Sequence, residues 1–422
     1  MLGPLYLFLL LVGIVPAVYL LTNAYLSRRR DHARRRVEVS PSDVTAVVPV
    51  RNQVPALFRA SIASIAQQGC RLVVVGDGCI EPYRSVTESF GGTFHELEVH
   101  VGKKRALAVG LAEVRTPFVL FVDSDTLLPP DAVRSMASRF VPEVGGVGAN
   151  LTVLDTGTSA AYCGEFVERA REVVLRAMSS RGSVLYLDGA CAMYRTDLIR
   201  PFVESSEFQD LRVLGRPRAL GDDWQLTDHV LKSGFQTVKA YDVSATTSPK
   251  ATLSSFVRQN VRWSRSNWVR LGSYLAGRGP RNRGAFFTFE VLGTYALPLV
   301  AFATLLSRLP LLVHLAGNVS SPLEFVGVLL LHSLFGISRG LNVALLGLSM
   351  TLLGSFATGV FLGTIVRGSH RPTVRMLAYG ALGTAVLFVT AIYGLLTFWK
   401  RSSWGEAAPN DPAEIATPRP TA

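Results

Sequence analysis

Two aspartates one residue apart, in Asp123-Ser124-Asp125, follow the apolar run Phe118–Val122. Residues two apart along a strand point to the same side, so both carboxylates can face one ligand. Carboxylate oxygens are ligands for Mg²⁺ or Mn²⁺, and such an ion can bridge the two phosphates of a sugar nucleotide. A triplet of this kind is also common as a polar turn at a strand end, so its interpretation depends on what accompanies it.

Two further stretches carry residue types that bind nucleotides. Asp77 follows a run of valines, where an acid at a strand end can accept a hydrogen bond from a base or a ribose. An ordinary Asp-Gly turn is the alternative interpretation. The Gly-Lys-Lys-Arg sequence at 102–105 predicts the start of a helix, where Lys103 and the helix N-terminus can both meet phosphate. For Lys104 and Arg105 taken singly, we expect a solvated run of charge.

A pair of adjacent acids, Asp222 and Asp223, follows Gly221. Sugar transfer with inversion needs a base that takes the proton from the attacking hydroxyl. One of two adjacent acids can do this while hydrogen bonds hold the other. The alternative is a helix N-cap, with either aspartate capping Trp224–Lys232. Both roles can hold at once.

Gln259, Arg262 and Trp263 lie on the amphipathic stretch Ser254–Leu275, which predicts a helix at a membrane–water interface. An arginine here can neutralise a leaving diphosphate, and the flat ring of Trp263 can stack on a sugar. Anchoring at the interface explains the same residues without catalysis, and spacing alone does not choose between the two.

The elements that must position these residues alternate between strands and helices, which predicts a mainly parallel, doubly wound α/β sheet. The expected strands are Val44–Val50, Leu72–Gly76, Phe118–Val122, Gly146–Leu151 and Thr237–Ala240. The expected helices include Ala56–Gln68, Lys103–Val114 and Pro130–Phe140. Ligands of such sheets bind beyond the carboxyl ends of the strands, where the strand order reverses.

Hydrophobic residues make up 49% of the 422 residues and charged residues 18%, a composition that leans towards a membrane protein. Leu5–Leu21 is almost wholly apolar and is followed by six arginines between Arg28 and Arg36. This order predicts a retained transmembrane helix with its N-terminus outside, rather than a cleaved signal peptide. The net charge of +12 comes without a nucleic-acid-binding motif, so no nucleic-acid partner is expected. The four cysteines lack metal-ligand spacing and are expected to be reduced thiols.

Apolar sequence returns in the last third of the chain. Phe286–Leu306 and Leu341–Val366 are long enough to span a membrane, whereas Leu311–Ile337 is interrupted and stays ambiguous. Leu377–Phe398 has basic residues on both sides, so it is either a span or a helix lying in the cytoplasmic leaflet. The Pro- and Ala-rich tail from Ala407 is expected to be disordered.

In this order, the motifs resemble those of the processive family-2 glycosyltransferases, which make β-linked polysaccharides. The resemblance runs from about Val44 to Trp404 and is strongest to the hyaluronan synthases, with chitin-oligomer synthases of nodulating bacteria a close second. The stretches that carry it are 102–105 (GKKR), 123–126 (DSDT), 221–223 (GDD) with Leu226-Thr227, 262–266 (RWSRS), and Leu395-Leu396-Thr397 followed by Trp404-Gly405. The resemblance implies a Rossmann-like GT-A catalytic domain combined with an α-helical transmembrane domain.

Site roles follow from the resemblance, residue by residue. On the donor side, it implies that Asp77 binds uracil or ribose, Lys103 binds the nucleotide, Asp123 binds the donor, and Asp125 with Asp123 forms the metal site. For the transfer itself, it implies a catalytic base at Asp223 beside Asp222. It further implies that Gln259, Arg262 and Trp263 bind the diphosphate and the acceptor, that Trp224 contacts the acceptor, and that Trp404 has a gating role. The implied cofactor is Mg²⁺ or Mn²⁺. The implied partners are UDP-GlcNAc, UDP-GlcA, the growing polysaccharide and the lipid bilayer.

The chain also departs from the hyaluronan synthases. Trp224 stands where they usually have arginine, Asp188-Gly189-Ala190 where they have Ser-Gly-Pro, and Glu406 follows Gly405. The sequence has one expected N-terminal span where they usually have two. These positions handle the acceptor and gating, so they bear on the identity of the product more than on the reaction type.

The function implied is that of a membrane-bound, processive, inverting enzyme that polymerises UDP-sugars and couples synthesis to export. A chitin-oligomer synthase is the first alternative and a non-processive, lipid-linked sugar transferase the second. We expect a multi-pass protein of the plasma membrane with its catalytic domain in the cytosol. The expected division is 1–26 (transmembrane helix), 27–43 (basic cytosolic linker), 44–253 (GT-A domain), 254–284 (interfacial helices), 285–399 (transmembrane and interfacial helices) and 400–422 (gating segment and disordered tail).

Overall fold

The computed structural model describes residues 3–28, 36–217, 221–280, 282–299 and 341–400, and all structural statements below concern these residues. The expected gating residue Trp404 and the ambiguous stretch Leu311–Ile337 lie outside them.

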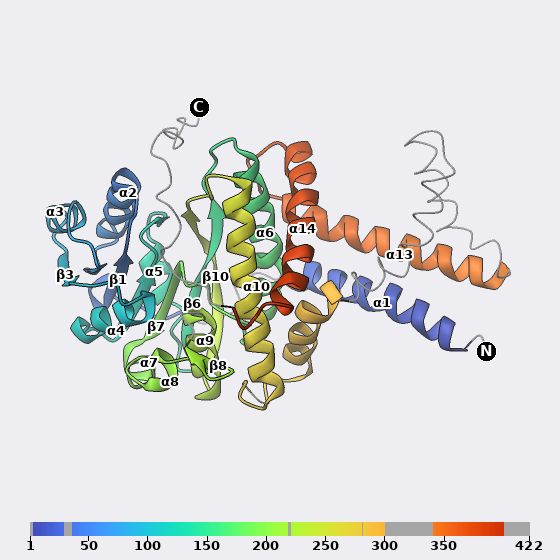
Figure 1. Ribbon diagram of the computed structural model, residues 1–422, viewed down its shortest axis with the longest axis horizontal. Helices are drawn as coiled ribbons and strands as arrows, with labels where there is room; N and C mark the ends of the chain where they lie inside the picture. The colour runs from blue at the N-terminus through green and yellow to red at the C-terminus, as the bar shows by residue number, and fades with distance from the viewer. Residues whose placement is uncertain (1–2, 29–35, 218–220, 281, 300–340, 401–422) are drawn as a thin grey trace.

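Within the described residues, the central element is an eight-stranded sheet with the order β3-β2-β1-β4-β7-β6-β10-β5 (Figure 1). Its strands are β1 Val44–Val50, β2 Arg71–Asp77, β3 Thr93–Leu97, β4 Phe118–Val122, β5 Thr126–Leu127, β6 Val144–Val153, β7 Cys191–Arg195 and β10 Gln236–Thr247. The block β3-β2-β1-β4 is parallel, as is the pair β6–β10. Strand β7 lies antiparallel between β4 and β6, and β5 is antiparallel to β10. The mainly parallel sheet expected from the sequence is therefore confirmed.

Helices cover both faces of the sheet because its inner strands are apolar on both sides. In β1, for example, Ala46 and Val48 belong to one buried cluster and Val47 to the other. The first face carries α2 Pro55–Ala66, α3 Tyr83–Ser89 and α5 Ala132–Ala137. The second carries α4 Lys103–Glu113, α6 Ser159–Ser179, α7 Thr196–Val203, α8 Ser206–Gln209 and α9 Asp222–Lys232. A short hairpin of β8 Arg212–Val213 and β9 Arg216–Pro217 precedes α9.

The first four expected strands and the first two expected helices occur within a few residues of their predicted bounds. The last expected strand, Thr237–Ala240, continues to Thr247 as β10, and the third expected helix, Pro130–Phe140, is shortened to α5. Helix α6 and strand β7 were not among the predicted elements. The strand β7 packs between two strands far away in sequence, and neighbouring residues do not reveal such a partner.

The amphipathic stretch forms one helix, α10 Leu253–Leu275, which starts at a capping box of Thr252 and Ser255. The apolar helix α14 Thr373–Leu395 runs beside α10 and α6 (Figure 1). Close approach is possible because α14 presents glycines: a Cβ at Gly380 would meet the ring of Phe166 on α6.

One helix of the described residues, α14, is long and apolar enough to cross a membrane. The helices α1 Gly3–Leu26 and α13 Leu341–Val366 lie side by side and extend away from the sheet (Figure 1). Further apolar helical stretches at 14–26, 285–299 and 352–366 are shorter. The structure therefore supports one candidate span among the described residues. The multi-pass membrane domain expected from the sequence stays a prediction.

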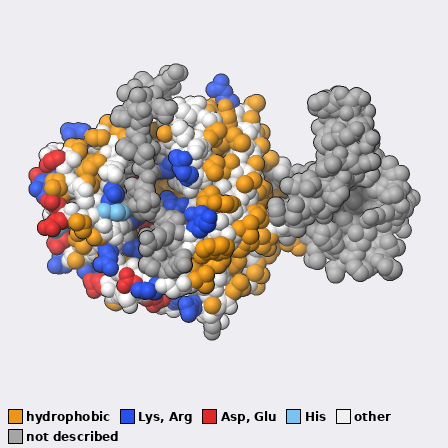
Figure 2. All heavy atoms as spheres, viewed as in Figure 1, with side chains coloured by type: hydrophobic (Ala, Val, Ile, Leu, Met, Phe, Trp, Pro, Cys, Tyr) orange, Lys and Arg blue, Asp and Glu red, His pale blue; other side chains and the backbone are white. Residues whose placement is uncertain are grey.

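Hydrophobic side chains gather on the part of the surface next to α10 and α14, whereas charged side chains gather over the opposite end of the sheet domain (Figure 2). On α14 and just after it, the exposed large apolar residues are Val374, Leu377, Leu382, Phe388, Val389, Tyr393, Leu396 and Trp399. An apolar surface of this kind is typical of a face that meets a membrane or another protein.

Replacing Gly380 with leucine should weaken the docking of α14 on α6, because overpacking costs about 1–3 kcal/mol. We expect the melting temperature of the detergent-solubilised protein to fall by roughly 2–10 °C. The matched control is Gly359→Leu on α13, where nothing lies within 4 Å of an added Cβ. Equal melting temperatures for the two variants would contradict this packing.

Candidate active site

A cavity of about 1330 Å³ lies where the carboxyl ends of β1 and β4 meet helix α10. Its wall includes Lys103 from α4, Asp123 and Asp125 after β4, and the start of α9. The sheet order reverses between β1 and β4, so the cavity occupies the place where ligands of such sheets bind. Its volume exceeds that of most single-ligand pockets, which leaves room for two substrates.

Asp123, Ser124 and Asp125 form the turn between β4 and β5 and all line the cavity. The strand geometry expected for the triplet is wrong, because the Thr126 amide donates to the Asp123 carbonyl at 3.0 Å and closes a turn. Both aspartates reach the cavity from this turn. The Asp123 amide in turn donates to the Ala190 carbonyl at 3.1 Å, which fixes the turn against the loop before β7.

The charge around Asp125 suits a cation. Burial and the neighbouring charge of Asp123 raise the pKa of Asp125 to about 6, against the opposing effect of Lys250. No group of three or more acidic, histidine or cysteine side chains with metal-binding geometry occurs in the described part of the chain. Mg²⁺ is commonly held by one or two carboxylates together with substrate phosphates, so two aspartates fit an ion that arrives with its nucleotide.

Lys103 joins the two acidic parts of the site. Its ammonium group lies 2.8 Å from Asp123 Oδ1 and 2.9 Å from Asp222 Oδ2, and it contacts the Gly189 carbonyl at 3.4 Å. Burial acts to lower the pKa of Lys103, but the two carboxylates outweigh it and raise the pKa above its usual value. The lysine therefore stays charged and holds the end of β4 and the start of α9 together.

The adjacent acids Asp222 and Asp223 are the first two residues of α9. The expectation that one of them caps the helix is wrong, because the N-cap is Gly221. Its φ of 76° is left-handed, and a Cβ there would meet the ring of Trp224, so the chain needs glycine at this position. The turn leaves both carboxylates on the cavity wall.

The surroundings shift the pKa values of the two acids in opposite directions. Burial raises the pKa of Asp222, but Lys103 outweighs it and lowers the pKa overall. Burial and the charge of Asp222 raise the pKa of Asp223 to about 6, with partial compensation from the Trp224 amide. A pair of carboxyl groups whose pKa values are driven apart is typical of an acid–base site, and Asp223 is the better proton acceptor.

Gln259, Arg262 and Trp263 from α10 line the same cavity as the aspartates. Trp224 also lines it, and its indole N–H donates to Ser266 Oγ on α10 at 3.0 Å. The structure thus brings together residues that lie up to 160 positions apart in the sequence, from Lys103 to Trp263, and that were predicted as one site.

Asp77 lies elsewhere: its side chain is fully buried, and its carboxylate accepts hydrogen bonds from the amides of Val101 at 2.7 Å and Gly102 at 3.0 Å. His100 Nδ1 lies 2.6 Å from the same carboxylate. Val101 and Gly102 line the cavity, so Asp77 shapes this part of its wall through the loop.

Two other expectations can be compared with the structure. The solvated charge predicted at Lys104 is wrong, because this lysine is buried over the ring of Phe208 and bonded to its carbonyl at 2.9 Å. All four cysteines are free, as expected.

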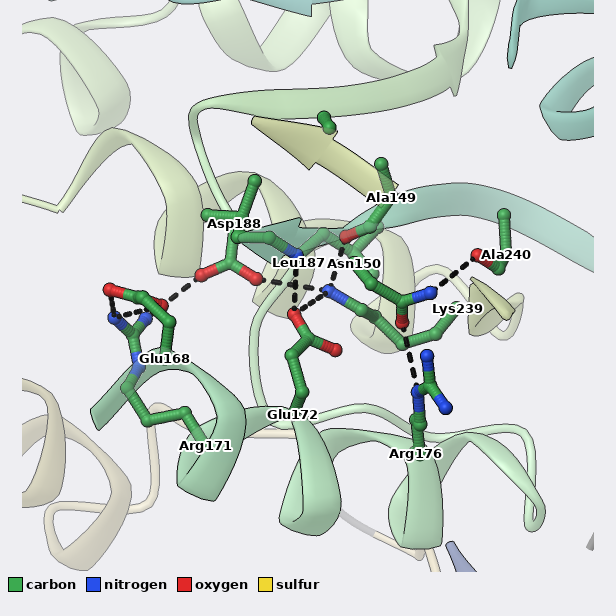
Figure 3. A network of polar contacts seen from close by, with 12 residues as sticks. Ala149, Asn150, Glu168, Arg171, Glu172, Arg176, Leu187, Asp188, Lys239 and Ala240 are labelled. Carbon is green, nitrogen blue, oxygen red and sulfur yellow. Dashed lines mark hydrogen bonds and ion pairs between the residues drawn. The ribbon is translucent and has the colours of Figure 1, made fainter. Parts of the chain in front are cut away.

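Sequence reasoning missed Glu168, Arg171 and Tyr186, which line the cavity beside Asp188, a position noted from the sequence only as a departure from the hyaluronan synthases. Figure 3 shows Glu168, Arg171 and Asp188 close together. These residues come from α6 and from the loop before β7. The available signal was the spacing of Glu168 and Arg171, three residues apart on a helix, but this spacing is common on solvated helix faces.

A family model described as glycosyltransferase-like family 2 matches residues 41–266. The chain is 28% identical to an N-acetylglucosaminyltransferase of Azorhizobium caulinodans, over 86% of each chain. It is 31% identical to an N-acetylglucosaminyltransferase of Rhizobium meliloti, over 65% of this chain and 69% of the relative. Among solved structures, a mannosyltransferase from Pyrobaculum calidifontis, in complex with GDP-Man and Mn²⁺, is similar with a TM-score of 0.49 at 15% identity, over 94% of this chain and 99% of that one.

Replacing Lys103 with methionine should destabilise the protein by about 1–2 kcal/mol at pH 7, between the values for exposed and fully buried ion pairs. In the wild type Lys103 lowers the pKa of Asp222, so its stabilisation is present at neutral pH and is lost as pH falls. In the variant, the largest opposing charge is gone and only Lys104 and a backbone hydrogen bond still oppose burial, so the pKa of Asp222 rises and protonation relieves the charge. The difference in melting temperature should therefore shrink between pH 7 and about pH 4.

The measurement is thermal unfolding in detergent with EDTA at several pH values. Arg105→Met is the matched control, since Arg105 lies on the same helix and pairs with Asp210 at 3.7 Å with both side chains exposed. A difference that stays constant with pH would show that Lys103 does not stabilise the site through these carboxylates.

Proposed function

Since the chain belongs to the glycosyltransferase-like family 2, we propose that it transfers N-acetylglucosamine from UDP-GlcNAc to a sugar hydroxyl and so builds a β-linked oligomer. The chain is a glycosyltransferase with a GT-A catalytic fold, as the sequence implied. The observation that carries the proposal is the single cavity that holds both a possible diphosphate site and a base.

Donor binding is assigned to the end of the cavity near β4. Asp123 and Asp125 would hold Mg²⁺ or Mn²⁺, which neutralises charge on the diphosphate as the sugar leaves. Lys103 and Arg262 line the same cavity and add positive charge for the diphosphate. The loop at Val101 and Gly102, supported by Asp77, is assigned to the nucleoside.

Transfer is assigned to Asp223. Its carboxylate accepts the proton of the acceptor hydroxyl while the hydroxyl oxygen bonds to the anomeric carbon of the donor sugar. The bond from that carbon to the phosphate oxygen breaks, and UDP leaves with the electron pair. Attack from the opposite side inverts the anomeric centre, so an α-linked donor yields a β-linked product. The raised pKa of Asp223 suits this role, because a base of very low pKa accepts protons poorly.

The choice of sugar rests on the relatives, which are named N-acetylglucosaminyltransferases. This supports the chitin-oligomer alternative over the hyaluronan interpretation that the motifs suggested first. A GlcNAc-only product needs one donor, whereas hyaluronan also needs UDP-GlcA. We assign the sugar ring of the acceptor to Trp263 and Trp224, which both line the cavity.

We further propose a processive enzyme of the plasma membrane, with residues 44–253 in the cytosol and residues 285–399 as its membrane part. The cavity wall includes Tyr295 and Pro298 from the apolar helix 285–299, and Leu387 and Ala391 from α14. A growing oligomer would therefore meet apolar helices directly behind the acceptor site. This path supports export of the oligomer between the helices.

The donor specificity is tested with the purified full-length chain in detergent. UDP-GlcNAc alone with Mn²⁺ or Mg²⁺ should release UDP and form a GlcNAc oligomer, and EDTA should abolish both. Adding UDP-GlcA should change neither the rate nor the product on a gel. Incorporation of glucuronate in alternation would instead establish the hyaluronan interpretation. UDP release without any saccharide product would contradict both the GlcNAc-oligomer and the hyaluronan interpretations.

Asp223→Asn should lower the rate of transfer by about 10²–10⁴-fold, the usual contribution of a general base. Stabilisation by UDP with Mn²⁺ in a thermal shift should persist, because the donor end of the cavity is unchanged. The matched control is Asp197→Asn, an exposed aspartate in the first turn of α7. Transfer at the normal rate by the Asp223 variant would remove the base assignment.

A further inference from the structure

Arg171 on α6 is held by hydrogen bonds at all three nitrogens of its guanidinium group. Figure 3 shows its contacts with Glu168 and Asp188. Its Nη1 donates to both carboxylate oxygens of Glu168, at 2.8 and 3.0 Å. Its Nη2 donates to Asp188 at 2.8 Å, and its Nε donates to the Tyr186 hydroxyl at 2.8 Å. A planar guanidinium bonded on all sides has little freedom to rotate, so its plane is set by these three partners.

Asp188 is itself anchored to the sheet. Its second oxygen lies 3.0 Å from Lys239 Nζ, and the same ammonium lies 2.8 Å from Glu172 on α6. Lys239 comes from β10, is fully buried, and donates to the Ala149 carbonyl of β6 at 2.5 Å. The arginine is therefore tied through Asp188 to strands β10 and β6 of the sheet (Figure 3).

One face of the ring of Trp263 is covered by this arginine. The Arg171 guanidinium carbon lies 5.0 Å from the ring centroid, within the range of a cation–π contact. Arg171 and Trp263 both line the cavity, and they come from different helices, α6 and α10. With one ring face occupied, the other is left for a ligand in the cavity.

The loop before β7, which carries Asp188, also reaches the donor end of the cavity. The two residues after Asp188 contribute backbone carbonyls there: Gly189 accepts from Lys103 Nζ at 3.4 Å, and Ala190 accepts from the Asp123 amide at 3.1 Å. A shift of Asp188 would therefore move groups that hold both Trp263 and Asp123. The network lies between the acceptor and donor sides of the cavity.

We propose that Arg171 is a positioning residue, which Glu168, Tyr186 and Asp188 hold against one face of Trp263 so that the other face binds the acceptor sugar. The inference rests on the proposed function, because it takes Trp263 as the acceptor platform. It goes beyond that function by assigning a role to α6 and to the Asp188–Lys239 pair. Arg171 contacts no reacting atom in this assignment and acts through the indole.

The test uses a double variant, Glu168→Gln with Arg171→Gln, which removes both partners of one ion pair and leaves Asp188 paired with Lys239. The matched control is Arg176→Gln. Arg176 lies on the same helix and packs over Tyr241 at 5.2 Å, away from the cavity.

Initial rates are measured with UDP-GlcNAc and Mn²⁺ against a β-linked N-acetylglucosamine tetrasaccharide as acceptor. The double variant should raise the KM for the acceptor at least tenfold, with the KM for the donor and the thermal shift by UDP within twofold of the wild type. Arg171→Lys should also raise the acceptor KM, because lysine keeps the charge and lacks the flat plane. The control should match the wild type.

A second measurement is independent of transfer. The fluorescence contributed by Trp263 is obtained as the difference between each protein and its Trp263→Phe counterpart, and is quenched with acrylamide. Loss of Arg171 should increase the quenching at least twofold, because the covered ring face becomes accessible. Unchanged quenching overturns the inference even if no transfer is found and the proposed function fails. An unchanged acceptor KM, or equal losses in donor and acceptor KM, overturns it where transfer is present.

Discussion

The ion pairs of Lys103 with Asp123 and Asp222 set the geometry on which the rest of the site depends. Carboxylates buried in one cavity repel each other, and each needs a cation or a hydrogen-bond donor to remain charged. The lysine sits at the N-terminus of α4 and draws together the end of β4 and the start of α9. Three elements far apart in the sequence are thereby aligned around the place where donor and acceptor would meet.

Buried carboxylates are also paired with cations on the cavity wall that includes Arg171 and Asp188. Asp188 lies between Arg171 and Lys239, and both cations come from elements that flank the loop before β7. Burial raises the pKa of the neighbouring Glu168 to about 7 despite Arg171. The cavity wall therefore contains two clusters of paired charges, one around Lys103 and one around Asp188. They keep the cavity polar and fix the positions of the side chains that line it.

Helix α10 connects this chemistry to the apolar helices. One of its faces carries Gln259, Arg262 and Trp263 into the cavity. Its other side docks on α14, where the Trp268 indole donates to the Ala391 carbonyl at 2.8 Å and Arg265 donates to Thr397 at 3.1 Å. A change in the position of α14 would therefore reach Trp263 through this one helix.

The sequence by itself determined the reaction class and most of the site, because local patterns of apolar residues mark strands and the motifs Asp123–Asp125, Asp222–Asp223 and Gln259–Trp263 occur in a specific order. The tertiary structure alone decided which groups compensate one another. The position of β7, the cap at Gly221, the burial of Asp77 and the network of Arg171 all depend on partners distant in sequence. Charge compensation acts through space over a few ångströms, and spacing along the chain does not encode it.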